Sequence, residues 1–151
     1  MANFVLDQAT IYCMQLFEQM TRSAVRDCIT GKVRDAIQEF ELTVFIVEPG
    51  EIGKAIGPRG AHVHKLEQLL NRRVKITEWN DEIGAFAQNL FYPAKVANIE
   101  QKERKLFVTP LDNPSRGQII GRGAIMLRFY EGILKRYFPI DVVQVVEPKE
   151  G

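Results

Sequence analysis

The sequence predicts an α+β protein built from two copies of one unit. Two observations predict this: an internal repeat at a spacing of 64 residues, and the same order of strand and helix patterns in each copy. The aligned pairs, in chain order, are Leu42 with Leu106, Val44 with Val108, Glu48 with Asp112, Gly53 with Gly117, Ile56 with Ile120, Gly57 with Gly121, Val63 with Leu127, Glu67 with Glu131, Leu69 with Ile133, Leu70 with Leu134 and Arg72 with Arg136. We therefore expect a first domain over residues 1–79 and a second over residues 80–151.

The first copy is predicted to begin with a helix capped by Asp7, whose carboxylate can accept hydrogen bonds from the free N–H groups of the next turn. Apolar residues then recur at helical spacing, at Ala9, Cys13, Leu16, Phe17 and Met20. Residues 24–30 can form a short strand, and residues 31–39 are polar, which favours a loop. Residues 42–47 are apolar and β-branched, as in a buried strand, and Pro49-Gly50 ends it.

A short helix, a glycine-containing turn at residues 57–60 and a second helix are expected next. We call this turn the first corner, and its repeat at residues 121–124 the second corner. The second helix places Val63, Leu66 and Leu70 on its inward side, and Val74 and Ile76 then alternate with polar residues as in a half-buried strand.

The second copy repeats this order. Asp81 is the expected helix cap, and Pro93 should stop that helix. Its inward face is predicted to hold Ile83, Phe86, Ala87 and Leu90. Residues 95–101, 105–109 and 141–146 indicate strands, and Pro114 suits the start of a helix. The helix after the second corner should bury Leu127, Tyr130, Leu134 and Tyr137. Each copy is thus predicted to form a three-stranded sheet with helices packed on one face.

Composition narrows the class of protein. Of 151 residues, 46% are hydrophobic, which is enough for packed cores. No stretch has the length and apolar character of a membrane span, and the N-terminus lacks the pattern of a signal peptide. Cys13 and Cys28 form no Cys-x-x-Cys pair, so we expect two buried thiols in a reducing compartment and a cytoplasmic location.

Positive charge is concentrated in the two corner segments, although the formal net charge is only +1. Residues 53–75 hold six basic residues and one acidic residue, and residues 116–136 hold five and one. This distribution predicts a polyanion bound at both corners. Two solvated helix faces that happen to be basic are the alternative.

The sequence offers no signal for small-molecule or enzyme chemistry. Gly53-Lys54 is followed by Ala55 rather than Ser or Thr, so the phosphate loop of many nucleotide hydrolases is absent. Gly121-x-Gly123 continues to Met126, so the dinucleotide fingerprint lacks its last glycine. The sequence shows no recognisable pairing of a catalytic nucleophile with a general base. We expect no catalysis, cofactor or small-molecule substrate.

His62 and His64 do not predict a metal site. On a helix, side chains two residues apart point in different directions, and the chain has no third histidine.

The remaining motif, Ile56-Gly57-Pro58-Arg59-Gly60, resembles the Ile-Gly-x-x-Gly signature of KH domains. In these domains the loop clamps a nucleic-acid backbone while bases lie beside it. A leading helix and strand in each copy resembles the type II KH arrangement. Two such units resemble the archaeal form of the NusA transcription factors over residues 5–147. Further stretches that carry the likeness are residues 16–18, 25–28, 52–57 and 89–96.

The resemblance implies a protein that binds single-stranded nascent RNA and acts with RNA polymerase in transcription termination or antitermination. Two alternatives stay open: a KH protein of ribosome assembly or RNA processing, and a protein-interaction module whose loops no longer bind RNA. The residues implied in RNA binding are Gly53, Lys54, Ile56, Gly57, Pro58, Arg59, Gly60, Ile120, Gly121, Arg122, Gly123 and Ala124.

The second corner departs from the KH pattern, because Ala124 replaces the closing glycine. We expect this methyl group to be tolerated if the φ angle of Ala124 is negative, and we expect the second corner to bind RNA less tightly than the first. Trp79 and Tyr92 could stack on bases, but we expect both to pack in the protein interior.

Overall fold

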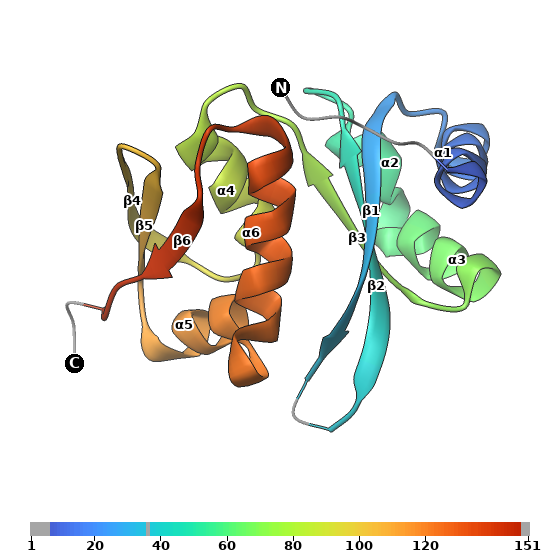
Figure 1. Ribbon diagram of the computed structural model, residues 1–151. Coiled ribbons are helices and arrows are strands. Elements are labelled where there is room, and N and C mark those ends of the chain that lie inside the picture. The colour runs from blue at the N-terminus through green and yellow to red at the C-terminus, as the bar shows by residue number, and fades with distance from the viewer. Residues whose placement is uncertain (1–6, 36, 149–151) are drawn as a thin grey trace. The chain divides into compact units, whose positions relative to one another are not determined.

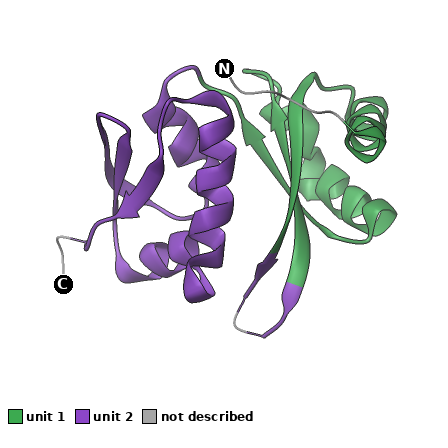
Figure 2. Cartoon of the chain, viewed as in Figure 1, with its two compact units in different colours: residues 1–32, 40–80 green, residues 33–39, 81–151 purple. Residues whose placement is uncertain are grey.

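The computed structural model describes residues 7–35 and 37–148 (Figure 1). The chain forms two compact units: residues 1–32 with 40–80, and residues 33–39 with 81–151 (Figure 2). We call them unit 1 and unit 2. Among the described residues, no helix is long and apolar enough to cross a membrane.

Unit 1 is organised around a three-stranded sheet. Its elements are α1 (Gln8–Thr21), β1 (Val25–Arg34), β2 (Glu39–Val47), α2 (Ile52–Ile56), α3 (Ala61–Leu70) and β3 (Arg73–Glu78), although the last two residues of β1 and the first of β2 are grouped with unit 2. The strand order is β1-β2-β3. Strands β2 and β3 are parallel, with Leu42 opposite Arg73 and Val47 opposite Glu78, because two helices carry the chain back between them.

Unit 2 repeats this plan with α4 (Ile83–Phe91), β4 (Val96–Lys102), β5 (Lys105–Pro110), α5 (Asn113–Ile120), α6 (Ile125–Tyr137) and β6 (Val142–Val145). Its strand order is β4-β5-β6, with β4 antiparallel and β6 parallel to β5. The predicted α+β class, with two three-stranded sheets and helices, is confirmed.

The core of unit 1 joins α1 to the sheet. Phe17 is fully buried and its ring stacks on Phe45 with centroids 4.4 Å apart. Cys13 and Cys28 are free thiols buried in the same cluster, as expected. Burial raises the pKa of Cys28 to about 12, so this thiol stays protonated at neutral pH.

The core of unit 2 lies between its sheet and the pair α4 and α6. Phe91 meets Tyr130 edge to face with centroids 5.3 Å apart. The inward residues predicted for α4 are all buried, and of those predicted for α6 only Tyr137 is half-buried. Ala9 was expected on the apolar face of α1, and this was wrong because Ala9 is exposed.

The prediction of a loop over residues 31–39 was wrong. Strand β1 continues to Arg34 and β2 begins at Glu39. Polar side chains are compatible with these strands because those of Lys32 and Arg34 are exposed while the backbone pairs. The turn itself is held by Asp35, whose Oδ1 accepts from the N–H groups of Ile37 and Gln38 at 2.8 and 2.9 Å.

The predicted cap at Asp81 was also wrong. Helix α4 begins one residue later, and Glu82 accepts from the N–H groups of Gly84 at 2.7 Å and Ala85 at 2.9 Å. The cap at Asp7 is confirmed, since its Oδ1 accepts from the Thr10 N–H at 2.8 Å.

The repeated glutamates join each corner helix to an edge strand. Glu67 on α3 accepts from the Val74 N–H on β3 at 3.1 Å, and Glu131 on α6 accepts from the Val143 N–H on β6 at 2.7 Å. Each carboxylate thereby satisfies a backbone donor of an edge strand. This explains why Glu67 and Glu131 coincide in the repeat.

We expect Glu131→Ala to lower the free energy of unfolding by about 2 kcal/mol, because a buried N–H then loses a charged acceptor. Urea denaturation would measure this. Glu147→Ala is the matched control, because Glu147 forms only an exposed ion pair with Arg116, and it should cost less than about 0.5 kcal/mol. Equal losses in the two variants would contradict the assignment.

Candidate nucleic-acid interface

The first corner joins α2 to α3 through Gly57 and a short 3-10 turn, Pro58–Gly60. Three of its residues have positive φ: Gly57 at 77°, Arg59 at 54° and Gly60 at 71°. Gly57 also has ψ of 171°, a backbone region that is essentially restricted to glycine. The Gly60 N–H donates to the Gly57 carbonyl at 3.1 Å and closes the turn.

The second corner has the same backbone. Gly121 lies at φ 70° and ψ −176°, Gly123 at φ 62° and Ala124 at φ 63°. The methyl group of Ala124 was expected to be tolerated if its φ were negative, and this condition is not met. Each corner needs three residues with positive φ and supplies glycine at only two of them. The third residue with positive φ is Arg59 in the first corner and Ala124 in the second. The two are not equivalent in the repeat, because Arg59 aligns with Gly123 and Gly60 aligns with Ala124.

The first glycine of each corner is packed against the helix that follows. A Cβ on Gly57 would lie 2.8 Å from the His62 ring, and a Cβ on Gly121 would lie 2.6 Å from Met126 Cγ. Gly60 and Gly123 differ, because a Cβ on either would meet no described atom within 4 Å. The outer side of each corner is therefore open.

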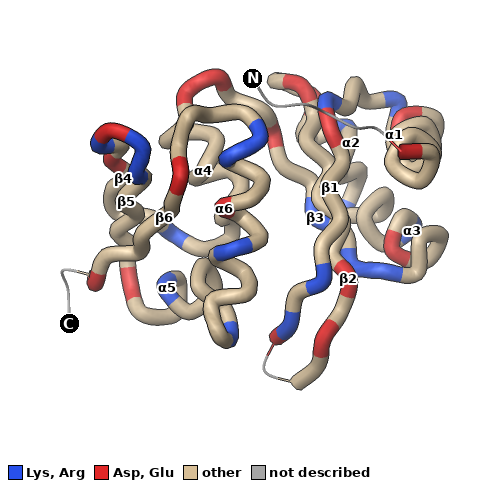
Figure 3. Tube along the Cα trace, viewed as in Figure 1, with Lys and Arg blue, Asp and Glu red and all other residues tan. Residues whose placement is uncertain are grey.

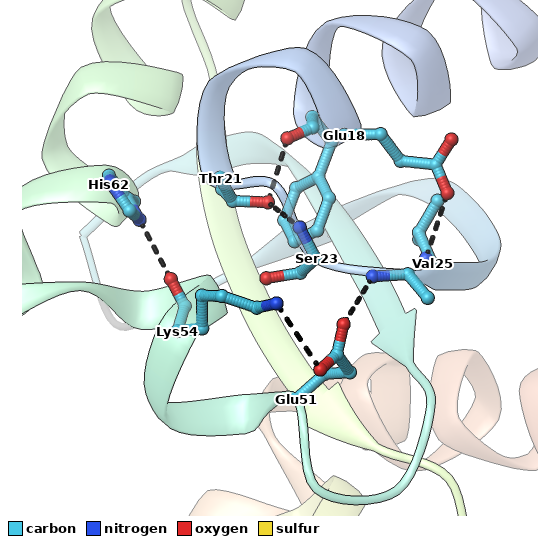
Figure 4. A network of polar contacts seen from close by, with 9 residues as sticks. Glu18, Thr21, Ser23, Val25, Glu51, Lys54 and His62 are labelled. Carbon is cyan, nitrogen blue, oxygen red and sulfur yellow. Dashed lines mark hydrogen bonds and ion pairs between the residues drawn. The ribbon is translucent and has the colours of Figure 1, made fainter.

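The His62 side chain contacts the end of α2 through its Nδ1 atom. This atom lies 3.1 Å from the carbonyl oxygen of Lys54 (Figure 4) and 3.1 Å from that of Ala55. Because these carbonyls can only accept, Nδ1 donates. This contact holds α2 against the start of α3. At the equivalent position Met126 makes an apolar contact with Gly121. Sequence reasoning missed both roles. In the described part of the chain, no three His, Cys, Asp or Glu residues form a metal-binding group.

Both corner helices begin without a side-chain cap. Gly60 and Ala124 occupy the cap positions of α3 and α6, and neither helix has an acidic residue in its first turn. By contrast, α1, α4 and α5 are capped by the carboxylates of Asp7, Glu82 and Asp112. The first N–H of each helix, that of Ala61 and of Ile125, donates to a carbonyl of the preceding turn. The positive end of the helix dipole, with no carboxylate beside it, favours an anion at both corners.

Lys and Arg occur in both units (Figure 3). Only part of their charge is free to meet an anion, because several of these side chains pair with acidic residues. Arg59 and Lys65 are exposed, and among the described residues neither side chain has a partner. Lys54 lies 3.6 Å from Glu51, and Arg122 is exposed at the second corner. Arg122 also interacts with another group of the protein. Other arginines of the two segments contact partners within the protein: Arg72 with Thr30 and Thr43, Arg73 with the Phe40 ring, Arg116 with Glu147, and Arg128 with Glu131.

The predicted site residues fall into two groups, one at each corner. Ile56 and Ile120 are half-buried at the ends of α2 and α5, directly before the glycines, and Gly53 and Lys54 are exposed on α2. Trp79 is buried, as expected, beneath the Arg26 guanidinium at 4.4 Å from the ring centroid. The expectation that Tyr92 packs in the protein interior was wrong, because Tyr92 is 72% exposed.

Lys75 is half-buried on β3, and its pKa is shifted. Burial lowers its pKa to about 8, below the usual 10.5. Between these values the unfolded chain binds more protons than the folded chain, so the free energy of unfolding should rise by up to about 3 kcal/mol as pH increases from 8 to 10.5. In Lys75→Met this rise should be absent and stability at pH 7 should be higher. Urea titrations of both proteins across this range would test it, and parallel pH profiles would contradict it.

Two α+β units, each with a glycine corner that opens an uncapped helix, are consistent with a two-KH-domain protein. No protein-family model matches the chain. The relatives are archaeal. A probable transcription termination protein NusA from Halococcus morrhuae is 29% identical over 93% of this chain and 96% of its own. A protein of the same name from Methanocaldococcus jannaschii is 28% identical over 97% of this chain and 77% of its own.

A third protein of this name, from Halobacterium salinarum, is 29% identical over 86% of this chain and 89% of its own. The resemblance to archaeal NusA proteins predicted from the sequence is therefore confirmed over most of the chain. The crystal structure of APE1850 has the same fold, with a TM-score of 0.70 at 20% identity over 93% of this chain and 99% of that one.

Proposed function

We propose that the chain is a NusA-type transcription factor whose two type II KH domains, residues 1–79 and 80–151, bind single-stranded nascent RNA. The leading helix and strand of each unit, and the parallel pairing of β2 with β3 and of β5 with β6, support the type II assignment. The names of the archaeal relatives support a role with RNA polymerase in transcription termination or antitermination. We propose a non-catalytic role in the cytoplasm.

The observation that carries the proposal is the repeated corner with an uncapped helix start. Phosphate groups would accept hydrogen bonds from N–H groups at the starts of α3 and α6, where α1, α4 and α5 have a capping carboxylate. The open sides of Gly60 and Gly123 let a sugar-phosphate backbone approach the main chain. Arg59 and Arg122 add charge, and bases would lie beside Ile56 and Ile120.

The salt dependence of RNA binding tests this proposal. Affinity for a single-stranded RNA should fall as salt rises, with a log–log slope of about −0.7 for each phosphate neutralised. A neutral-backbone analogue of the same sequence is the control and should bind far more weakly. Equal affinity for both, or no binding of RNA at low salt, would favour the protein-interaction module.

The identity of the bound RNA separates transcription from the other RNA roles. Crosslinking in cells followed by sequencing of the attached RNA should recover nascent transcripts. Recovery of ribosomal RNA alone would assign the protein to ribosome assembly or RNA processing.

A further inference from the structure

His62 packs against the first glycine of the first corner. A Cβ added to Gly57 would lie 2.8 Å from His62 Nδ1 and 3.1 Å from its Cε1, so the imidazole ring lies directly on the main chain of the turn. The Cα–Cβ bond of a helical residue tilts toward the N-terminus of its helix. The His62 side chain accordingly reaches back from α3 to the end of α2 (Figure 4). The ring is therefore at the same end of α3 as the proposed phosphate site.

The hydrogen bonds of His62 determine which ring nitrogen carries the proton in the neutral form. Nδ1 donates to the carbonyl oxygens of Lys54 and Ala55. Nε2 is then an unprotonated acceptor, and no residue in the described ranges forms a hydrogen bond with it. A second proton can be added at Nε2 without breaking the contact with α2. The ring can therefore gain a positive charge while the first corner keeps its structure.

We infer that His62 takes up a proton when a phosphate group occupies the first corner, so that RNA binds this corner more tightly as pH falls below 7. The inference rests on the proposed function, which places a phosphate at the start of α3. A nearby anion favours the protonated form of an imidazole by roughly tenfold or more. At the second corner, Met126 aligns with His62 and packs on Gly121, so that corner has no proton to gain.

The other ionisable groups near His62 change little between pH 5.5 and 7.0. Carboxyl groups ordinarily titrate at about pH 4, and phenols, thiols and cationic side chains above about pH 8. Lys75 has a lowered pKa of about 8, which is still above this range. Histidine titrates inside the range, and the chain has only two, His62 and His64.

This covers every element packed against α3. The carboxylates on α1, α2, α3 and β3, including helix caps, are Asp7, Glu18, Glu51, Glu67 and Glu78. The cationic side chains on these elements and in the turn are Lys54, Arg59, Lys65, Arg73 and Lys75. Tyr12 and Cys13 lie on α1. A change of RNA affinity with pH in this range is thus assigned to one of the two histidines.

The test measures the affinity of the full chain for a single-stranded RNA between pH 5.5 and 7.0 at constant ionic strength. His62→Met removes the titrating group and installs the residue that packs on the glycine of the second corner. His64→Met is the matched control, because side chains two residues apart on a helix point in different directions. NMR signals of the histidine rings, recorded with and without RNA, identify the ring that takes up the proton.

Wild type should bind RNA about threefold more tightly at pH 5.5 than at pH 7.0. His64→Met should keep this dependence, and His62→Met should lose it while matching wild type at pH 7.0. RNA should shift the titration of the His62 ring to higher pH. Equal affinity of wild type across the range would overturn the inference, as would a pH dependence that His62→Met retains or that His64→Met abolishes.

A second neutral variant guards against damage to the fold. In His62→Gln, the side-chain N–H group can still donate to the carbonyls of α2, and this variant should also bind RNA independently of pH. Salt-sensitive RNA binding by wild type without any pH dependence would overturn this inference and leave the proposed function intact. Failure of wild type to bind RNA at every pH would count against both.

Discussion

Replacing Gly60 and Ala124 together by Asp is expected to lower the affinity for single-stranded RNA about 100-fold. Both residues occupy the cap positions of the corner helices, at φ of 71° and 63°. Asp tolerates this conformation better than most residues, and the added atoms meet open space at Gly60. A carboxylate at each helix start would occupy the anion site and repel phosphate. A loss of about 1.4 kcal/mol at each corner corresponds to tenfold each.

The Asn pair is the matched control. Gly60→Asn with Ala124→Asn has the same shape and the same tolerance of positive φ but no charge. It should bind RNA within a few-fold of wild type, and both double variants should unfold at similar urea concentrations. The single Asp variants then report on the corners separately. If Asp and Asn variants lose affinity equally, shape and not charge governs binding, and the anion-site account is wrong.

Gly121→Ala is expected to be the most destabilising single change at the interface, with a loss of roughly 4 kcal/mol in the free energy of unfolding. Two costs combine. At φ 70° and ψ −176° any side chain is strained by about 1–3 kcal/mol. The new Cβ would also lie 2.6 Å from Met126 Cγ and 3.1 Å from the Met126 backbone nitrogen, so the start of α6 must shift.

Gly123→Ala serves as its control, since it shares the positive φ without the contact. Its φ is 62°, and a Cβ there meets no described atom within 4 Å, so the expected loss is about 1–2 kcal/mol. Chemical denaturation of both variants measures the difference. A loss at Gly121 no larger than that at Gly123 would show that the close contact with Met126 does not exist in solution.

The sequence was sufficient to predict the order of elements, because the repeat and the apolar periodicities are local signals. The helix cap at Asp7 and the inward face of α4 could be read directly. The hairpin at residues 31–39 could not, because strand pairing there is decided by a neighbouring strand and not by side-chain burial. Asp81 and Glu82 are both plausible caps, and only the backbone geometry decides between them.

The positions of the two glycine corners were predicted from the sequence, but the backbone conformation that requires glycine there was not. The pattern shows where glycines lie and not which φ angles they adopt. It therefore gave no warning that Ala124 takes a positive φ or that Arg59 does the same. The count of basic residues also overstated the free charge, because ion pairs and cation–π contacts depend on partners distant in sequence. The exposure of Tyr92 was missed because burial also depends on residues that are distant in sequence.

Backbone amide chemical shifts measured by NMR during titration with a single-stranded RNA test the central claim most directly. The account predicts that the largest chemical-shift changes occur in two segments, residues 57–63 and 121–127. The changes in both segments should become smaller together as salt is raised. Changes confined to one segment would reduce the interface to a single corner. Large changes elsewhere with both corners unaffected would contradict the account.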